Sequence, residues 1–469
     1  MRRLGKAVIA VLCVLTLTAT AVACSSDSGS GGESGNTTGV TDTTIKIAVA
    51  VSDLDGLRAA GFNLAPALTT NNLSKRVTSY FDEWNEAGGI NGRKIEYKVL
   101  VWDPVKPATA EKVCDDATVN DQVFAFINAS GMGAKYVECI AAAGVPTFFG
   151  DVAPQSAHDT GWFTSISPSA ELNASSGVKA AIAAGQIPKG AKVGILVGNG
   201  PEHVAAATAA EAELKANGNT VTVARVNTLG GDAGVQNTES AAAVNAFRAA
   251  GVTNAVVGLQ FTAARGFYDA AAGAGFKFTI LDVASSMCTA YGATQISAAA
   301  MGSDCFTVFG DSVTNSGKLA TETPFEQECR AKFDALSAKT KDYPTKSSPG
   351  VPSGSTYTLP DGTVLSSDYP PNECTISVAI KRALEKAGKN LSRESFMKAL
   401  RGLGDVDVAL ASNGKGTQEP GKTYFATLTH SVKLTAGKDA AKGTNGLFNG
   451  CAAPYNCWVP NSAEWFAIK

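Results

Sequence analysis

The polar residues best placed to bind a small molecule follow apolar runs that have the length of β-strands. Ser130, Gly131 and Met132 follow the apolar run 123–128 after Ala129 and precede a predicted helix at 133–143. A hydroxyl and free backbone N–H groups at the start of a helix can receive a carboxylate, because the helix dipole favours negative charge there. Ser130 could instead simply cap that helix, since serine is a preferred N-cap residue.

Further polar candidates follow the other strand-like runs. Asp151 comes after the run 145–149, where its carboxylate could pair with an ammonium group or form part of a turn. Ligands of doubly wound sheets bind outside the carboxyl ends of the strands. By the same rule, the second half of the chain offers Asn199, Glu202 and His203 after 192–197, Gln260 and Phe261 after 255–259, and Asp282 with Ser285 after 278–281.

None of the short motifs that mark common enzyme sites is present. The chain lacks a G-x-S-x-G elbow, a P-loop, an H-E-x-x-H pair and a complete G-x-G-x-x-G fingerprint, and the Gly-Asn-Gly run at 198–200 lacks the third glycine. Its only histidines are His158, His203 and His430, and it has no C-x-x-C pair. We therefore expect no enzyme, no cofactor and no metal site, and the alternative is a hydrolase whose triad carries no local motif.

The order of the predicted elements indicates an α/β fold. Strand-like runs begin near residues 192, 220, 255 and 278, and a helix-like segment separates each from the next. This alternation is typical of right-handed βαβ units and a parallel sheet, so two such runs, 43–165 and 168–284, predict two doubly wound lobes. The last third is less regular, with helices expected at 324–340 and 375–387, strands at 304–309, 424–434 and 464–469, and a polar surface excursion at 342–372.

The first 23 residues have the pattern of a secretory signal peptide. Basic residues precede an apolar run at 7–17, and small residues at 19–23 lead into Cys24. The run is too short for a comfortable membrane span. The cysteine resembles that of a bacterial lipobox, in which it becomes the lipidated N-terminus, although Ala21 stands where such boxes usually carry Leu. We predict lipidation of Cys24, and an ordinary signal peptide is the alternative.

Composition describes the rest of the chain in broad terms. The segment 24–42 is rich in Ser, Gly and Thr and is predicted to be a flexible tether. The body at 43–469 is long enough for two domains. A net charge of −2 and an isoelectric point of about 6.0 give no sign of a nucleic-acid surface. No apolar stretch after the leader reaches the length of a membrane span.

The cysteine count predicts disulfide bonds. Cys13 leaves with the leader and Cys24 is used by the lipid, which leaves an even set of eight in an exported chain. Eight cysteines allow 105 connectivities, so the sequence does not fix the pairs. Pairing between neighbours along the chain is our working hypothesis: Cys114 with Cys139, Cys288 with Cys305, Cys329 with Cys374, and Cys451 with Cys457.

Four segments carry a more specific pattern. The segment 81–95, FDEWNEAGGINGRKI, contains the pattern N-x-x-G-G-I-N-G-R between a helix and a strand. The others are the opening strand at 45–51, the run AKVGILV at 191–197 and the stretch FRAAGVTNAVV at 247–257. These segments, and 81–95 most specifically, resemble the type I periplasmic binding proteins of the branched-chain amino-acid (Leu/Ile/Val) class, which deliver ligands to ABC importers. The resemblance covers about 43–310 well and continues loosely to the C-terminus.

The resemblance implies two α/β lobes joined by three hinge crossings, with the ligand held between the lobes. We place the crossings near Ile166, Gly302 and Asp405. The first lobe is then 43–166 with 303–404, and the second is 167–302 with 405–469. In this fold the cleft closes around the ligand by a hinge motion.

The resemblance also implies roles for particular residues. In similar proteins a serine at the place of Ser130 receives the ligand's carboxylate, and a short stretch that matches Gly150, Asp151 and Val152 meets its amino end. Some relatives have a disulfide where Cys114 and Cys139 lie. The second-lobe candidates depart from the amino-acid binders, which offer aromatic residues and a Glu in these loops, and Asp282 could substitute for that Glu.

The expected function is that of a solute-binding protein, lipid-anchored on the extracytoplasmic face of the cell membrane. It would capture a small polar metabolite (an amino acid, an amide or a small carboxylate) and present it to the permease subunits of an ABC importer. Its partners would be this ligand, the permease and, through the lipid, the membrane, but no nucleic acid. Similar lobes also serve receptors as ligand-sensing modules, which is the alternative from a different class.

Overall fold

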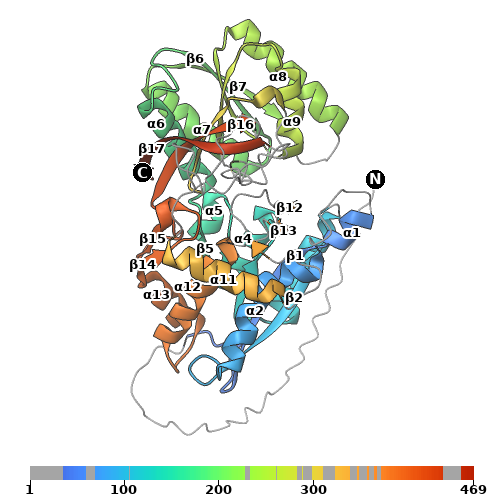
Figure 1. Cartoon of the computed structure of the whole chain (residues 1–469), viewed down its shortest axis with the longest axis vertical. Helices are drawn as coiled ribbons and strands as arrows, with labels where there is room; N and C mark the ends of the chain where they lie inside the picture. The colour runs from blue at the N-terminus through green and yellow to red at the C-terminus, as the bar shows by residue number, and fades with distance from the viewer. Residues whose placement is uncertain are drawn as a thin grey trace, which may run out of the picture. The chain divides into compact units, whose positions relative to one another are not determined.

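The computed structural model describes residues 35–59, 69–104, 106–227, 233–259, 261–281, 288, 298–309, 323–338, 346–347, 356–358, 364–366, 371–436 and 456–469. The predicted signal peptide, Cys24 and the tether as far as residue 34 lie outside these residues. Two large β-sheets organise the described chain, and helices cover both faces of each (Figure 1). We call the part around the sheet that contains the first strand the first lobe, and the part around the other sheet the second lobe.

The first sheet has five parallel strands in the order β2-β1-β3-β4-β5. Its strands are β1 (Thr44–Ser52), β2 (Lys94–Trp102), β3 (Ala125–Asn128), β4 (Thr147–Phe149) and β5 (Phe163–Ser165). The helices between them are α1 (Leu54–Ala59), α2 (Thr70–Glu86), α3 (Pro107–Asp115) with a π-helical turn at Asp116–Asn120, α4 (Ala134–Ala142) and α5 (Gln155–Asp159). The last third of the chain adds α11 (Pro324–Ala338), α12 (Pro371–Ala387) and α13 (Arg393–Arg401), and α12 packs beside α2 (Figure 1).

The central strand β1 is buried on both of its faces. Ile45, Ile47 and Val49 enter a core that also holds side chains from α2, α12 and α13. Ala48 and Ala50 point the other way, into a core shared with α3 and α4. Successive side chains of a strand point to opposite faces, and a parallel sheet is covered on both, so residues 47–51 of β1 are all apolar.

The second sheet has seven strands in the order β17-β16-β10-β9-β8-β6-β7. Its strands are β6 (Lys192–Gly198), β7 (Thr220–Val226), β8 (Asn254–Gly258), β9 (Lys277–Leu281), β10 (Asp304–Thr307), β16 (Leu428–Ala436) and β17 (Asn456–Ala467), and its helices are α6 (Ala170–Ala183), α7 (Pro201–Ala216), α8 (Ala233–Ala250) and α9 (Phe261–Ala270). The strands from β6 to β10 run parallel, whereas β16 and β17 are antiparallel to their neighbours. The predicted doubly wound α/β fold in two lobes is therefore confirmed, with an antiparallel edge that the sequence did not reveal.

Two of the three predicted lobe crossings lie elsewhere in the structure. The strand β10 belongs to the second sheet, so the chain leaves the second lobe after Thr307 and not near Gly302. Val406, Val408, Phe425 and Ala426 pack in the first-lobe core, so the return follows Ala426 and not Asp405. Ile166 lies in the first-lobe core, and its carbonyl accepts a hydrogen bond from the Ala426 N–H at 3.0 Å.

Smaller elements complete the described chain. A two-stranded sheet joins β14 (Gly404–Asp407) to β15 (Lys415–Gln418). Part of the predicted surface excursion at 342–372 forms a three-stranded sheet of β11 (Lys346–Ser347), β13 (Val364–Ser366) and β12 (Thr356–Thr358). Short 3₁₀ turns lie at Ala298–Ala300 and Ser412–Gly414.

The end of the predicted tether is packed against the first lobe. The Asn36 N–H donates to Glu394 Oε2 at 2.7 Å, and the Arg393 N–H donates to Asn36 O at 2.8 Å. Gly39 has a φ of +77°, and a Cβ there would lie 2.3 Å from the Phe124 backbone nitrogen. Residues 35–42, which were expected to belong to a flexible tether, are therefore part of the folded body, and we call residues 35–40 the N-terminal latch.

Three disulfide bonds join cysteines that we expected to pair. They are Cys114–Cys139, Cys288–Cys305 and Cys329–Cys374. Cys451 and the side chain of Cys457 lie outside the described residues, so their pairing stays a prediction.

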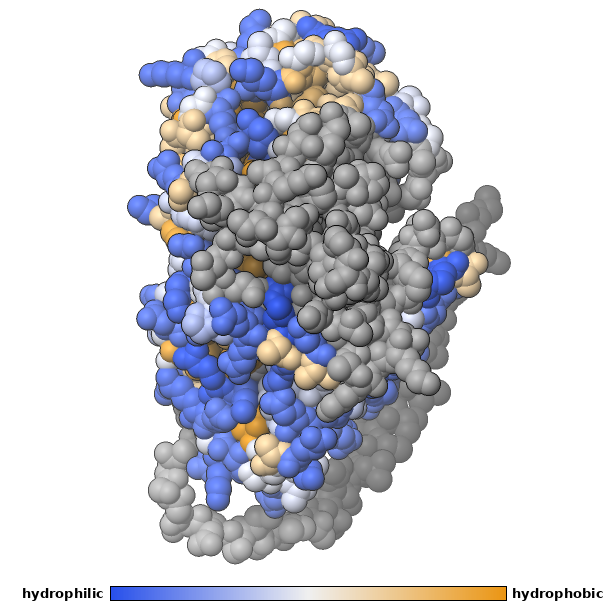
Figure 2. All heavy atoms as spheres, viewed as in Figure 1, coloured by the Kyte–Doolittle hydropathy of each residue, from blue (hydrophilic) through white to orange (hydrophobic). Residues whose placement is uncertain are grey.

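The described surface is polar over most of the face shown in Figure 2, where hydrophobic side chains form small separate groups. Among the residues that the structure describes, no helix has the length and apolar character needed to cross a membrane.

Candidate functional site

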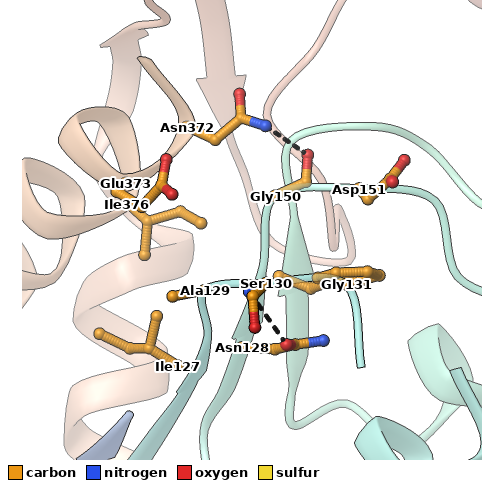
Figure 3. Close-up of a pocket in the computed structure, with 11 residues that line it drawn as sticks. Ile127, Asn128, Ala129, Ser130, Gly131, Gly150, Asp151, Asn372, Glu373 and Ile376 are labelled. Atoms are coloured by element: carbon orange, nitrogen blue, oxygen red, sulfur yellow. Dashed lines mark hydrogen bonds between the residues drawn. The ribbon is translucent and has the colours of Figure 1, made fainter. Parts of the chain in front are cut away.

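A pocket lies at the carboxyl ends of β3 and β4 and is completed by the first turn of α12 (Figure 3). Its volume is about 120 Å³. Apolar side chains of Ile127, Phe149 and Ile376 form one part of the lining, and the rest comes from Asn128, Ala129, Ser130, Gly131, Gly150, Asp151, Asn372 and Glu373. Four of the predicted ligand-binding residues, Ser130, Gly131, Gly150 and Asp151, therefore meet in one pocket.

The loop after β3 is shaped by the buried side chain of Asn128. Its Oδ1 accepts hydrogen bonds from the N–H groups of Ser130 at 3.4 Å and Met132 at 3.2 Å, and its Nδ2 donates to Met132 O at 2.9 Å. The sequence had suggested that these two N–H groups would be free to bind a ligand. In the structure both donate to Asn128. The Gly131 N–H donates no hydrogen bond to any residue that the structure describes, and Gly131 has a φ of +70°.

The Ser130 side chain turns toward the ends of β1 and β2. Its Oγ accepts from the Ser52 N–H at 2.6 Å and from Trp102 Nε1 at 3.4 Å. It is not the cap of α4, whose N-cap is Gly133 and has no side-chain hydrogen bond. A hydroxyl has one proton to donate and two lone pairs to accept with. Because both lone pairs have donors, Ser130 can offer its proton to a ligand.

Backbone and side chain approach closely where β4 meets α12. The Asn372 Nδ2 donates to Gly150 O at 3.3 Å (Figure 3). A Cβ at position 150 would lie 2.9 Å from Asn372 Cβ, closer than ordinary contacts allow. Glycine at position 150 therefore lets α12 reach the pocket.

We expect Gly150→Ala to lower the free energy of unfolding by about 1–3 kcal/mol, as overpacking does elsewhere. The added methyl group pushes the first turn of α12 away from β4. Urea unfolding of Gly150→Ala, Asn372→Gly and the double variant measures this. Because Asn372→Gly removes the atoms that the added methyl group would meet, the two costs should not add. Additive costs would show that the contact is unimportant.

Glu373 contributes a second carboxylate to the pocket. It lies in the first turn of α12, and its Oε1 is 4.0 Å from Arg76 Nη1 of α2. The two side chains are 12% and 13% exposed. Burial raises the pKa of the Glu373 carboxyl, and the charge of Arg76 opposes that rise.

The other first-lobe candidates have different environments. Asp151 lines the pocket, and its Oδ1 accepts from the Val152 N–H at 2.8 Å. The side chains of Met132 and Val152 are buried in hydrophobic cores and are not part of the lining. They were predicted because they stand beside the right residues in sequence, but each apolar side chain points into a core.

Asn199, Glu202 and His203 lie at the carboxyl end of β6, in the second lobe. Glu202 and His203 belong to the first turn of α7, and no second-lobe residue that the structure describes is part of the pocket lining. His203 is 1% exposed, and its Nδ1 lies 3.1 Å from Gly258 O and 3.4 Å from the Gly198 nitrogen. Its ring thus links the ends of β6 and β8. Burial lowers the pKa of His203, and Glu202, 3.8 Å from its Nε2, acts against that change.

The remaining second-lobe candidates fall in segments that the structure leaves undescribed. Gln260, Asp282, Ser285 and the side chain of Phe261 lie outside the described residues. Among the residues that are described, no group of three or more His, Cys, Asp or Glu side chains could hold a metal ion.

Sequence reasoning missed Asn372 and Glu373. They stood at the end of a segment read as a surface excursion, far from β4 along the chain, and nothing local tied them to Gly150. Two signals were available. Pro371 is a typical first residue of a helix, and Cys374 fixes this turn through its disulfide to Cys329.

Solved structures with this architecture cover most of the chain. A fatty acid ABC transporter substrate-binding protein from Thermomonospora curvata is 19% identical, with a TM-score of 0.60 over 92% of this chain and 94% of that one. A type 1 periplasmic binding protein from Bordetella pertussis Tohama I is 14% identical, with a TM-score of 0.58 over 84% and 98%. A substrate-binding protein from Desulfitobacterium hafniense in complex with Leu is 15% identical, with a TM-score of 0.52 over 84% and 98%. The fold is that of the type I periplasmic binding proteins.

The sequence gives the family as well. The profile of a family described as periplasmic binding protein matches residues 70–351, which is more than half of the chain. The chain therefore belongs to the periplasmic binding protein family, and the resemblance found in its sequence is confirmed. No curated protein matches it significantly by sequence.

Proposed function

We propose that this chain is the extracytoplasmic solute-binding component of an ABC importer. The observation that carries the proposal is the pocket at the carboxyl ends of β3 and β4, which combines apolar side chains with hydrogen-bonding groups in the fold of this family. Ligand pockets have this mixed character, with a few polar groups that fix the orientation of the ligand. Residues at the carboxyl end of β6 and the undescribed second-lobe candidates would complete the site when the lobes close.

The ligand is a small polar metabolite, such as an amino acid, an amide or a small carboxylate. The solved relatives do not decide among these classes, since one is a fatty acid ABC transporter substrate-binding protein and another is in complex with Leu. The pocket's volume of about 120 Å³ fits one end of such a molecule. Cys24 would hold the protein at the membrane through a lipid, close to the permease.

A thermal-shift screen of the purified chain against amino acids, amides and carboxylates tests the binding role. A ligand that binds only the folded state at 100 times its dissociation constant should stabilise it by about 2.7 kcal/mol. Uptake of the labelled ligand should then fall in cells that lack the chain. Binding without any change in uptake would favour a ligand-sensing receptor module, and absence of binding across the panel would contradict both roles.

A further inference from the structure

A short loop between β14 and β15 lies beside two of the places where the chain passes from one lobe to the other. We call residues 409–414 the hinge loop. Three of its non-glycine residues have left-handed backbone, since Leu410, Ser412 and Asn413 have φ values of +49°, +48° and +56°. Such values are uncommon outside glycine, and asparagine tolerates them better than most residues. This strain persists only where the surrounding structure holds the segment, and it often marks a part of a protein that switches between conformations.

Ser412 binds both of the passages that flank the hinge loop. The residue is 0% exposed, and its N–H donates to Val308 O at 2.6 Å, directly after β10. Its Oγ accepts from the N–H groups of Thr427 and Leu428, each at 2.8 Å, where β16 begins. These donors use both lone pairs of the hydroxyl, and its oxygen also lies 3.1 Å from Thr427 Oγ1. One residue of the first lobe therefore ties the chain that leaves the second lobe to the chain that returns to it.

The hinge loop is also attached to the helices of the first lobe. The Ala409 N–H donates at 3.0 Å to Oγ1 of Thr375, which belongs to α12 and adjoins the pocket-lining residue Ile376. The Leu410 N–H donates at 2.9 Å to Oε1 of Glu326, in the first turn of α11. Both acceptor residues are buried, with exposed fractions of 1% and 7%. A displacement of α12 therefore reaches the two passages through the backbone of the hinge loop.

We propose that the hinge loop couples the position of α12 to the passages between the lobes, with Ser412 as the residue that joins the two passages. Left-handed backbone is costly for Leu and Ser, so the loop gains freedom when its hydrogen bonds break, and a switch needs such a pair of alternatives. A ligand that moves the first turn of α12 then shifts the populations of the lobe arrangements. This inference rests on the proposed function, because it names the route by which the pocket controls closure of the cleft.

Double electron–electron resonance on the purified, ligand-free chain tests the proposal. Spin-labelled non-canonical amino acids would replace Glu86 in the first lobe and Lys277 in the second, both of them exposed, and report the distribution of distances between the lobes. We expect Ser412→Ala to widen this distribution about twofold, because the lobes lose a shared tether. Ser74→Ala is the matched control, since Ser74 is a buried serine of α2 whose Oγ donates to Asn71 O at 2.8 Å. An unchanged width in Ser412→Ala, or an equal change in Ser74→Ala, would overturn the proposal.

Two variants of Asn413 test the role of the left-handed backbone. The side chain of Asn413 is exposed, so its replacement leaves the core intact. Valine strongly disfavours a positive φ, whereas glycine adopts it freely. We expect Asn413→Val to widen the distribution as Ser412→Ala does, and Asn413→Gly to keep the wild-type width. Equal widths in these two variants would refute the proposal, and the comparison remains decisive if Ser412→Ala does not fold.

The variant Thr375→Val tests the link to α12. It removes the acceptor of the Ala409 N–H at nearly constant shape and touches neither passage, yet we expect it to widen the distribution. Thr147→Val is the matched control, since Thr147 is a buried threonine of β4 whose Oγ1 donates to Val145 O at 2.8 Å. A wild-type width in Thr375→Val would show that α12 is not coupled to the passages. No ligand enters these measurements, so their failure would leave the proposed binding role intact.

Discussion

Lowering the pH from 7 to 5 is expected to reduce the free energy of unfolding by about 4 kcal/mol, because two buried histidines stay neutral in the fold. Burial lowers the pKa of His158 to about 3 and that of His430 to about 4. In the unfolded chain both titrate near 6.5, so below that pH the unfolded state binds protons that the folded state does not. Each histidine then costs about 2 kcal/mol over this range, and the cost keeps growing until the pH reaches the folded pKa.

Both histidines lie beside the lobe crossings. His158 Nδ1 is 2.7 Å from Thr423 Oγ1, and His430 Nε2 is 2.7 Å from Phe309 O. His203, with its lowered pKa, adds to the loss of stability in acid, whereas the raised pKa of Glu373 opposes it. Urea unfolding at pH 7, 6 and 5 measures the slope. In the double variant His158→Asn with His430→Asn, the free energy of unfolding should depend less on pH. An unchanged slope in that variant would contradict this account.

Removal of the Cys329–Cys374 disulfide is expected to cost about 4 kcal/mol of stability. The bond closes a loop of 45 residues, and in the chain-entropy model a cross-link restricts the unfolded chain more as the loop grows. We also expect weaker ligand binding, because Cys374 adjoins Glu373 and fixes the first turn of α12. Thermal unfolding and titration of the variant Cys329→Ala with Cys374→Ala give both quantities.

The Cys288–Cys305 bond supplies a matched control. It closes only 17 residues and lies in the second lobe, away from the pocket lining. The same model gives about 3 kcal/mol for its removal, and ligand affinity should be unchanged. An equal loss of affinity in the two double-alanine variants would mean that the Cys329–Cys374 bond has no particular role at the pocket.

The sequence was most informative where local pattern and tertiary environment agree. The apolar runs at 47–51 in β1 and 193–198 in β6 are buried on both faces, so their composition alone indicated parallel strands and doubly wound lobes. The loops after β3 and β4 followed from the same reasoning, and they bring Ser130 and Asp151 to the pocket. Local sequence, read a few residues at a time, was therefore enough to predict where the buried strands lie.

The features that the sequence did not reveal depend on contacts between distant segments. The strand β10 looks like any other short apolar run, and only its pairing with β9 shows which lobe it belongs to. Asn372 reaches Gly150 across 222 positions of the chain. The N-terminal latch is polar in composition and is held by hydrogen bonds to Arg393 and Glu394, which no local pattern encodes. Met132 and Val152 lie beside the pocket residues in sequence, but their side chains are buried in hydrophobic cores, and no local pattern showed that orientation.

The N-terminal latch limits how far the folded body can lie from any surface to which Cys24 is attached. Gly35 is only 11 positions after Cys24, and a chain extends by at most about 3.5 Å per residue, so the leash cannot exceed about 40 Å. That length is comparable to the thickness of a lipid bilayer with its headgroups. The leash also starts from one fixed point, beside Glu394 at the beginning of α13. Attached in this way, the molecule would stay within a short distance of the membrane. Its point of attachment would always lie on the same side of the first lobe.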